Sequence, residues 1–365
     1  MTGEGKARWV ALLAALAPAW GVVALGAEGL VEPRPSWATK SYLTFYFDND
    51  LFGGSDANYT NGARLAWISG AMDFEDVGPV QRWMRPFTGD RESLPMFQAL
   101  TGFRDMEAVE YHFGASLTQL MFTPESWWVY GQPPLERRYA GWLGLGLSLH
   151  VKDDQVLNAV EFTIGTVGPN AMAEESQDAV HGARDLYKFN GWNSQVPNEL
   201  TLDLSLVQKR RLEFFSLGDG AIRLDGVGDW GVRLGNFRTR AHIGGMFRLG
   251  YNLPPDFSDP RLSDTAYSHR IFRDGQDYEG PWSAYLLFGA TARAIAHDAT
   301  IDGPLFEPDF NTGNHREPFV GEVFAGFGLR YRDCELGYAH TFRSKEYREQ
   351  LGAQDFGTVA VRVRF

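Results

Sequence analysis

The sequence contains a single cysteine, Cys334, and no grouping of Cys and His at the spacing of a zinc site. One cysteine excludes the intramolecular disulfide framework that stabilises many small secreted domains. Beyond residue 27 the chain also lacks a run of about 18 apolar residues, so no segment there is predicted to cross a membrane as a helix. A disulfide scaffold, a zinc domain and a helical membrane protein are therefore all disfavoured.

Positive charge is scarce as well. The chain has 34 Lys and Arg residues against 46 Asp and Glu, which gives a formal net charge of −12. A protein that binds nucleic acid needs a basic face to neutralise phosphates. We therefore predict no nucleic-acid partner.

The N-terminal residues 1–26 have the layout of a secretory signal peptide. Lys6 and Arg8 precede an apolar stretch, residues 9–24, which is followed by small residues suited to cleavage. The stretch is short for a transmembrane helix and contains a proline. We predict that the signal is removed and that residues 27–365 form a single domain.

The chain is rich in glycine and aromatic residues, and its apolar residues recur with period two. Residues 143–150, for example, place Leu at every odd position and Gly, Ser or His at every even one. A soluble β-sandwich of the periplasm would also alternate, but the last segment, residues 357–365, ends on Phe365 without a tail. That ending resembles the recognition signal of bacterial outer-membrane barrels. It favours an all-β protein, a transmembrane antiparallel β-barrel with lipid outside and a polar lumen.

Twelve segments are predicted as strands, an even number as a closed single-chain barrel requires. Both termini are then expected on the periplasmic side, with a short helix in one extracellular loop. Two connections, residues 71–108 and 251–281, are long for periplasmic turns. Trp127, Trp128 and Trp142 are predicted to belong to the aromatic girdle at the membrane interface. The predicted strands are 41–48, 60–70, 109–120, 139–150, 157–167, 199–208, 211–224, 236–250, 282–295, 321–332, 334–343 and 357–365.

Two polar clusters fall in connections at one rim of the predicted barrel. The first, residues 47–62, reads FDNDLFGGSDANYTNG and carries more oxygen ligands than a hairpin turn needs. The second, residues 168–199, contains a predicted helix capped by Asn170. Gln177 and His181 are four residues apart and share one face of that helix. We expect this face to point at the first two strands.

These residues permit a specific chemistry. The amide and carboxylate oxygens of Asn49 and Asp50 suit a hard cation such as Ca²⁺. A neutral His181 could take a proton from water, while a cation stabilises the developing oxyanion. Such a set of groups hydrolyses an ester without a covalent nucleophile.

The pattern as a whole resembles a known family, the outer-membrane lipid A 3′-O-deacylases of the LpxR type. The resemblance covers most of the mature chain. It is carried by Asn49-Asp50, Asp56 with Tyr59-Thr60-Asn61-Gly62, Gln119 followed by Phe122-Thr123-Pro124, and Gly168-Pro169 through Gln177 and His181 to Gly191-Trp192 and Gln195.

The resemblance implies a carboxylic ester hydrolase of the bacterial cell outer membrane that removes the 3′ acyloxyacyl chain from lipid A. It implies Ca²⁺ as cofactor and lipid A or lipopolysaccharide in the outer leaflet as partner, and we expect a monomer. Within the implied site His181 is the base, Asn49 and Asp50 hold or orient Ca²⁺, and Thr60 and Gln177 line it.

The chain departs from the family pattern at two positions. Some members carry a Lys in the connection between strands three and four, where this chain has none; Arg137 or Arg138 is a hypothetical replacement for contact with a lipid A phosphate. Some members also have an acidic residue six positions after the His, where this chain has Tyr187.

Two alternatives remain. One is an outer-membrane phospholipase-type acyl hydrolase with Ser-His chemistry, for which Ser55 and Ser176 are the candidate nucleophiles in the polar clusters. The other is a non-enzymatic channel barrel. Lumen faces rich in Tyr, Phe and Gly predict a filled interior, which disfavours a wide pore.

Overall fold

The computed structural model describes residues 40–53, 58–72, 101–103, 109–218, 220–262 and 281–365. The chain divides into two units, Met1–Pro33 and Arg34–Phe365, and the described residues all belong to the second. The predicted signal peptide, residues 1–26, lies outside the described residues.

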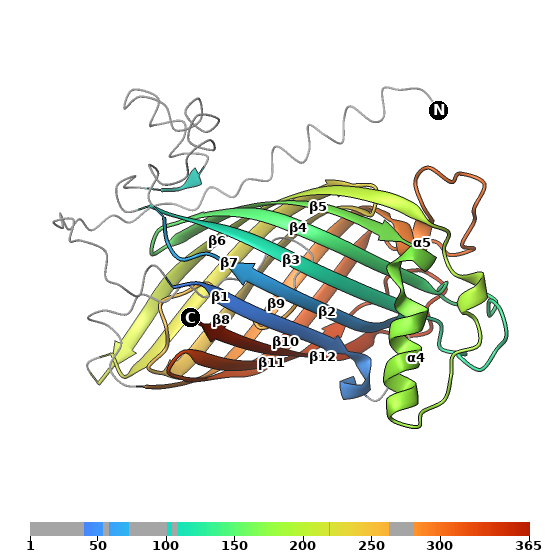
Figure 1. Cartoon of the computed structure of the whole chain (residues 1–365). Coiled ribbons are helices and arrows are strands. Elements are labelled where there is room, and N and C mark those ends of the chain that lie inside the picture. The colour runs from blue at the N-terminus through green and yellow to red at the C-terminus, as the bar shows by residue number, and fades with distance from the viewer. Residues whose placement is uncertain (1–39, 54–57, 73–100, 104–108, 219, 263–280) are drawn as a thin grey trace, which may run out of the picture. The chain divides into compact units, whose positions relative to one another are not determined.

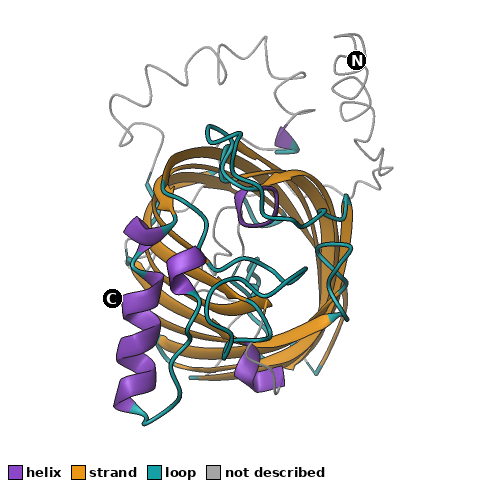
Figure 2. Cartoon of the chain, turned by 90° about the vertical axis from the view of Figure 1, so that its right-hand side faces the viewer, coloured by secondary structure: helices purple, strands orange, loops and turns teal. Residues whose placement is uncertain are grey.

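Twelve antiparallel strands close into one barrel, in which each strand pairs with its neighbours in sequence and β1 pairs with β12 (Figures 1 and 2). The predicted strand number and fold class are confirmed. No helix among the described residues has the length and apolar character needed to span a membrane. The strands are β1 (Tyr42–Asn49), β2 (Asn58–Ile68), β3 (Glu110–Thr123), β4 (Ala140–Lys152), β5 (Val156–Val167), β6 (Glu199–Leu217), β7 (Ile222–Gly235), β8 (Arg238–Tyr251), β9 (Trp282–Asp298), β10 (Phe319–Tyr331), β11 (Cys334–Arg343) and β12 (Gln354–Arg364).

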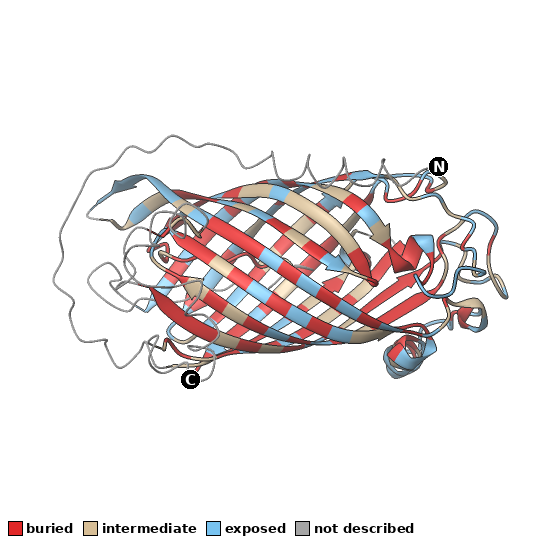
Figure 3. Cartoon of the chain, turned by 90° about the horizontal axis from the view of Figure 1, so that it is seen from above, coloured by how far each residue is buried: buried red, intermediate tan, exposed pale blue. Residues whose placement is uncertain are grey.

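Period-two alternation determines which side chains face outward. Figure 3 shows buried and exposed positions alternating along the strands, as in β4, where Leu145 and Leu147 are exposed and Gly146 and Ser148 are buried. The outward face is thus apolar and suited to lipid, and the lumen face is polar. Arg362 lies on the lumen side as predicted, where its guanidinium donates to Thr44 and Tyr46.

One predicted hairpin is wrong. The sequence predicts separate strands over residues 199–208 and 211–224, with the turn at the charged residues 209–210. In the structure β6 runs on to Leu217, and β7 begins at Ile222. The turn lies between them because Gly218 and Gly220 adopt positive φ angles of 60° and 90°, which glycine reaches without strain.

The long connection after β8 enters the barrel. Arg248 of β8 is fully buried, and it donates to Asp225 of β7 and to Asp256 of the connection. Phe257 packs in the same interior cluster as Leu253. The described part of this connection therefore fills lumen space; residues 263–280 lie outside the described part, as does most of the connection 71–108.

Candidate functional site

Both polar clusters lie at the same end of the barrel. Tyr42 pairs with Arg364, so β1 begins and β12 ends at one rim. Strand alternation then places the β1–β2 and β5–β6 connections together at the opposite rim, which we call the α4 rim after its helix (Figure 1). The predicted placement of both clusters on one rim is confirmed.

The β5–β6 connection forms the short helix η3 (Pro169–Ala171) and then α4 (Ala173–Ala183). Asn170 does not cap α4 as predicted; the cap position is Met172, at a φ of 54° and without a side-chain hydrogen bond. Glu174 and Glu175 in the first turn favour the helix because their charge complements its dipole.

Helix α4 lies on the outer wall of the barrel, at the ends of β3 and β4 (Figure 2). Gly141 of β4 faces outward, and a Cβ atom there would be 2.6 Å from the Cβ of Ala173. From β3, the Gln119 side chain donates to the carbonyl of Ala171 at 2.8 Å and to the hydroxyl of Ser176 at 3.1 Å. The missing side chain at Gly141 and the Gln119 amide together fix the helix close to the wall.

These contacts show where the helix docks. It packs mainly against β3 and β4, and the orientation of its buried face toward the first two strands stays a prediction. Gln177 and His181 form hydrogen bonds with residues of their own connection, Trp192 and Tyr187. Docking on β3 and β4 follows from the small residues Gly141 and Ala173 at the contact.

A row of outward positions joins the two clusters. Asn49 pairs with Asn61, Asn61 with Met121, and Met121 with Gly141, beneath α4. At about 4.8 Å per strand the row spans about 14 Å. The pairing of β2 with β3 shifts between Tyr59 and Asn61, so Thr60 is the extra residue of a bulge. Its hydroxyl is 2.6 Å from that of Thr123.

The first cluster divides between the lumen and the outer wall. Asp48 accepts from the Tyr59 hydroxyl at 2.8 Å and faces the barrel interior, so it serves the fold. Asn49 ends β1 and is partly buried; Asp50, fully buried, begins the short helix η2 (Asp50–Gly53). Residues 54–57, with Ser55 and Asp56, lie outside the described residues.

His181 is buried and held in one orientation. Its Nδ1 lies 2.6 Å from the carbonyl oxygen of Tyr187. A carbonyl can only accept, so Nδ1 carries the proton of the neutral imidazole and Nε2 carries the lone pair. In this state His181 is a proton acceptor at Nε2.

Gln177 lies one helical turn before His181 on the same buried face. Its Oε1 accepts from the indole Nε1 of Trp192 at 2.8 Å, which fixes the amide so that Nε2 points the other way. Among the described residues this buried Nε2 makes no hydrogen bond. It is a donor available to a bound group. Trp192 is part of the family pattern in the sequence, but its contact with Gln177 is visible only in the structure.

The oxygen groups of the first polar cluster are chemically suited to bind a hard cation. Asn49 supplies an amide oxygen and Asp50 a carboxylate, both of the type that Ca²⁺ prefers. Within the described ranges no group of three His, Cys, Asp or Glu side chains is placed to hold a metal ion. Asn49 and Asp50 could therefore supply two ligands, and water, backbone carbonyls or substrate would complete the shell.

Two hypothetical phosphate contacts are not supported. Arg137 is fully buried and bonds to Glu346 at 2.7 Å and Thr300 at 2.5 Å. Arg138 donates to the backbone carbonyls of Asn311, Thr312 and Ser194. Both guanidinium groups thus hold connections of the barrel.

The predicted place of Trp142 in the aromatic girdle is wrong. Trp142 faces the lumen, is fully buried and stacks on Phe237 with ring centres 4.4 Å apart. Trp127 packs among loop residues beside α4, while its neighbour Trp128 is exposed.

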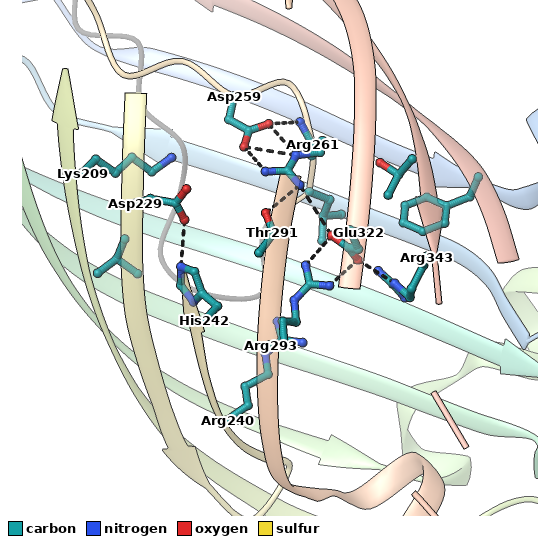
Figure 4. A pocket seen from close by; sticks show the side chains of 14 residues that line it. Lys209, Asp229, Arg240, His242, Asp259, Arg261, Thr291, Arg293, Glu322 and Arg343 are labelled. Carbon is teal, nitrogen blue, oxygen red and sulfur yellow. Dashed lines mark hydrogen bonds and ion pairs between the residues drawn. The ribbon is translucent and has the colours of Figure 1, made fainter. Parts of the chain in front are cut away.

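The pocket in Figure 4 lies in the barrel interior, away from α4. Glu322 lies at its centre and pairs with Arg293 and with Arg343, whose Nε is 2.6 Å away. His242 pairs with Asp229 at 2.9 Å. The lumen was predicted to be filled by Tyr, Phe and Gly, but much of its filling is ionic. Polar groups facing away from lipid satisfy one another there.

Comparison with known proteins places the chain. A family model described as outer membrane protein LpxR matches residues 10–365. The structure of LpxR from Salmonella typhimurium aligns with a TM-score of 0.64 at 16% identity, covering 89% of this chain and 100% of that one. The β domain of the Bordetella autotransporter Brka aligns with a TM-score of 0.40 at 8% identity, covering 89% and 97%. No curated protein sequence matches.

Fold and family model together define the class: an outer-membrane β-barrel protein, with a polar helix-covered region on the outer wall at one rim. Within that class, the chain belongs to the LpxR family.

Proposed function

We propose that this protein is a Ca²⁺-dependent lipid A 3′-O-deacylase, which hydrolyses the ester of the 3′ acyloxyacyl chain. Membership of the LpxR family supports an outer-membrane lipid A deacylase. The observation that carries the catalytic part of the proposal is His181, held on the lipid-facing wall with Nε2 as proton acceptor.

The residues divide the work as follows. His181 Nε2 takes a proton from water, and the resulting hydroxide attacks the ester carbonyl. The Nε2 of Gln177 can donate to the oxygen on which negative charge develops. The imidazolium then returns its proton to the leaving sugar oxygen as the acyl–oxygen bond breaks. The products are a fatty acid and a free hydroxyl group.

Asn49 and Asp50 would hold the cation in this scheme. Bound Ca²⁺ would supply positive charge that stabilises the developing oxyanion. Thr60, tied to Thr123, lines the same outer face. The location suits the substrate, since a lipid approaches this face of the barrel laterally from the membrane.

A Ser-His mechanism is less well supported. The Ser176 hydroxyl donates to the carbonyl of Met172 at 2.8 Å and accepts from Gln119. Its proton is therefore directed at a backbone oxygen, and neither of these two partners is His181. A passive channel is disfavoured by the ion pairs and the inserted connection that fill the lumen.

The test is acyl release from lipid A by the detergent-folded protein. We expect His181→Ala to lose about a hundredfold or more, the range of a general base, and Ser176→Ala to retain most activity. If Ser176→Ala were inactive and His181→Ala active, the proposed chemistry would be wrong.

A further inference from the structure

The orientation of His181 depends on a backbone carbonyl outside α4. The bond from Nδ1 to the Tyr187 oxygen is the one that selects the tautomer. Within the described part of the chain no carboxylate forms a hydrogen bond or ion pair with His181. The position of one carbonyl thus determines which ring nitrogen can act as the base.

That carbonyl lies in a short exposed turn that follows the helix. The turn reverses the chain after Ala183, with Asp185 at a φ of 53° and the amide of Leu186 donating to the His181 carbonyl at 2.9 Å. Lys188 pairs with Asp178 of α4, and this hydrogen bond raises the pKa of the Lys188 ammonium. An exposed ion pair of this kind contributes little rigidity by itself.

Aromatic stacking provides a stronger restraint. The ring of Tyr187 stacks on the indole of Trp127, with ring centres 3.7 Å apart and planes inclined by 16°. Trp127 belongs to the β3–β4 connection, and its carbonyl accepts from the amide of Asn190 at 3.2 Å. It packs against a buried cluster made by Met121, Tyr139, Ala173, Phe189 and Trp192.

We propose that Trp127 and Tyr187 form an aromatic clamp that positions the Tyr187 carbonyl and so keeps His181 in the Nδ1–H tautomer. They are positioning residues, since they act on the reaction through His181. The inference rests on the proposed function of His181, and it adds the device that makes Nε2 the basic atom. The indole of Trp127 in the β3–β4 connection thereby controls the basic nitrogen of His181 in the β5–β6 connection.

The chain offers a matched pair of variants. Trp127→Ala removes the stack, whereas Trp128→Ala removes an adjacent indole that is 61% exposed. Tyr187→Phe keeps a ring on Trp127, and Trp127→Phe keeps a smaller one. We expect Trp127→Ala to lower kcat by up to about a hundredfold with little change in KM, because small misplacements of a catalytic group have that effect. Trp128→Ala and Tyr187→Phe should stay near wild type, with Trp127→Phe between.

A second readout separates positioning from folding. The ¹⁵N resonances of the His181 ring, assigned by their loss in His181→Ala, distinguish the two tautomers. We expect wild type and Trp128→Ala to show the Nδ1–H tautomer alone, and Trp127→Ala to show a mixture of both tautomers. Heat-modifiable gel mobility should show that the barrel of Trp127→Ala is still folded. If the wild type releases no acyl chain, the proposed function fails, yet the ring resonances still test the clamp.

Two results would overturn the clamp. One is a Trp127→Ala protein with wild-type kcat and a pure Nδ1–H ring. The other is a rise in KM alone, which would mean that Trp127 contacts the lipid directly.

Discussion

His181 and Gln177 owe their chemistry to partners that the sequence does not reveal. Their four-residue spacing predicts a shared helical face, and both are buried on that face. The Tyr187 carbonyl that orients His181 is a backbone atom, so no residue type announces it. The indole that orients Gln177 belongs to the Gly191-Trp192 pair of the family pattern, but that pattern does not say which side chain the indole contacts.

In the first polar cluster, the sequence suggests more ligands than the structure supports. Its excess of oxygen ligands predicted a cation site, but Asp48 and Asn58 bond to Tyr59 and Tyr347 and hold the fold instead. Side-chain direction along β1 decides this, because Asp48 and Asn49 point to opposite faces.

The predicted dependence on Ca²⁺ can be tested by comparing two carboxylates of the first polar cluster, Asp50 and Asp48. We expect Asp50→Asn to raise the Ca²⁺ concentration for half-maximal acyl release by about tenfold or more, since affinity for Ca²⁺ depends on ligand charge. Asp48→Asn keeps an oxygen for Tyr59 and should leave that concentration unchanged. Chelator should abolish release by the wild type. Equal Ca²⁺ dependence in both variants would remove Asp50 from the cation site.

At the scale of elements, the position of α4 depends on one glycine. The sequence predicts the helix to within two residues of its start, because residues 171–181 contain neither Pro nor Gly. Where the helix docks could not be predicted, since Gly141 reads as one of several glycines in an alternating strand. Its contact with Ala173 determines the docking position.

Gly141→Val should therefore displace α4 while the barrel still folds. We expect acyl release to fall by up to about a hundredfold, as for a catalytic group moved by about 1 Å. Gly182→Ala is the control, because a Cβ atom there meets nothing within 4 Å and alanine is favoured in a helix by about 1 kcal/mol. The two activities are measured on protein of equal heat-modifiable mobility. Unchanged activity in Gly141→Val would show that catalysis does not depend on the docking position of α4.

At the scale of the molecule, the barrel follows from period-two patterning. Three features were predictable, because lipid selects one face of every strand. They are the even number of strands, the outward-facing Leu and Phe side chains, and the pairing of the last strand with the first. The β6–β7 hairpin was not, since Lys209 is buried in the lumen although its neighbourhood reads as a charged turn. In a barrel with a polar lumen, a charged residue can lie within a strand, so a run of charges does not by itself predict a turn.

The filled lumen predicts an absence of conductance. Arg248 is tied to Asp225 and to the inserted Asp256, and Glu322 to Arg343. We expect purified protein in planar bilayers to show no sustained ohmic current of the porin type. A steady open-channel current would instead favour the channel alternative.

The most direct measurement of the central claim is the mass of lipid A before and after incubation with folded protein and Ca²⁺. We expect the wild type to remove the mass of the 3′ acyloxyacyl chain, and we expect no loss with His181→Ala or with chelator. Loss of a different acyl chain, or the same loss with His181→Ala, would contradict it.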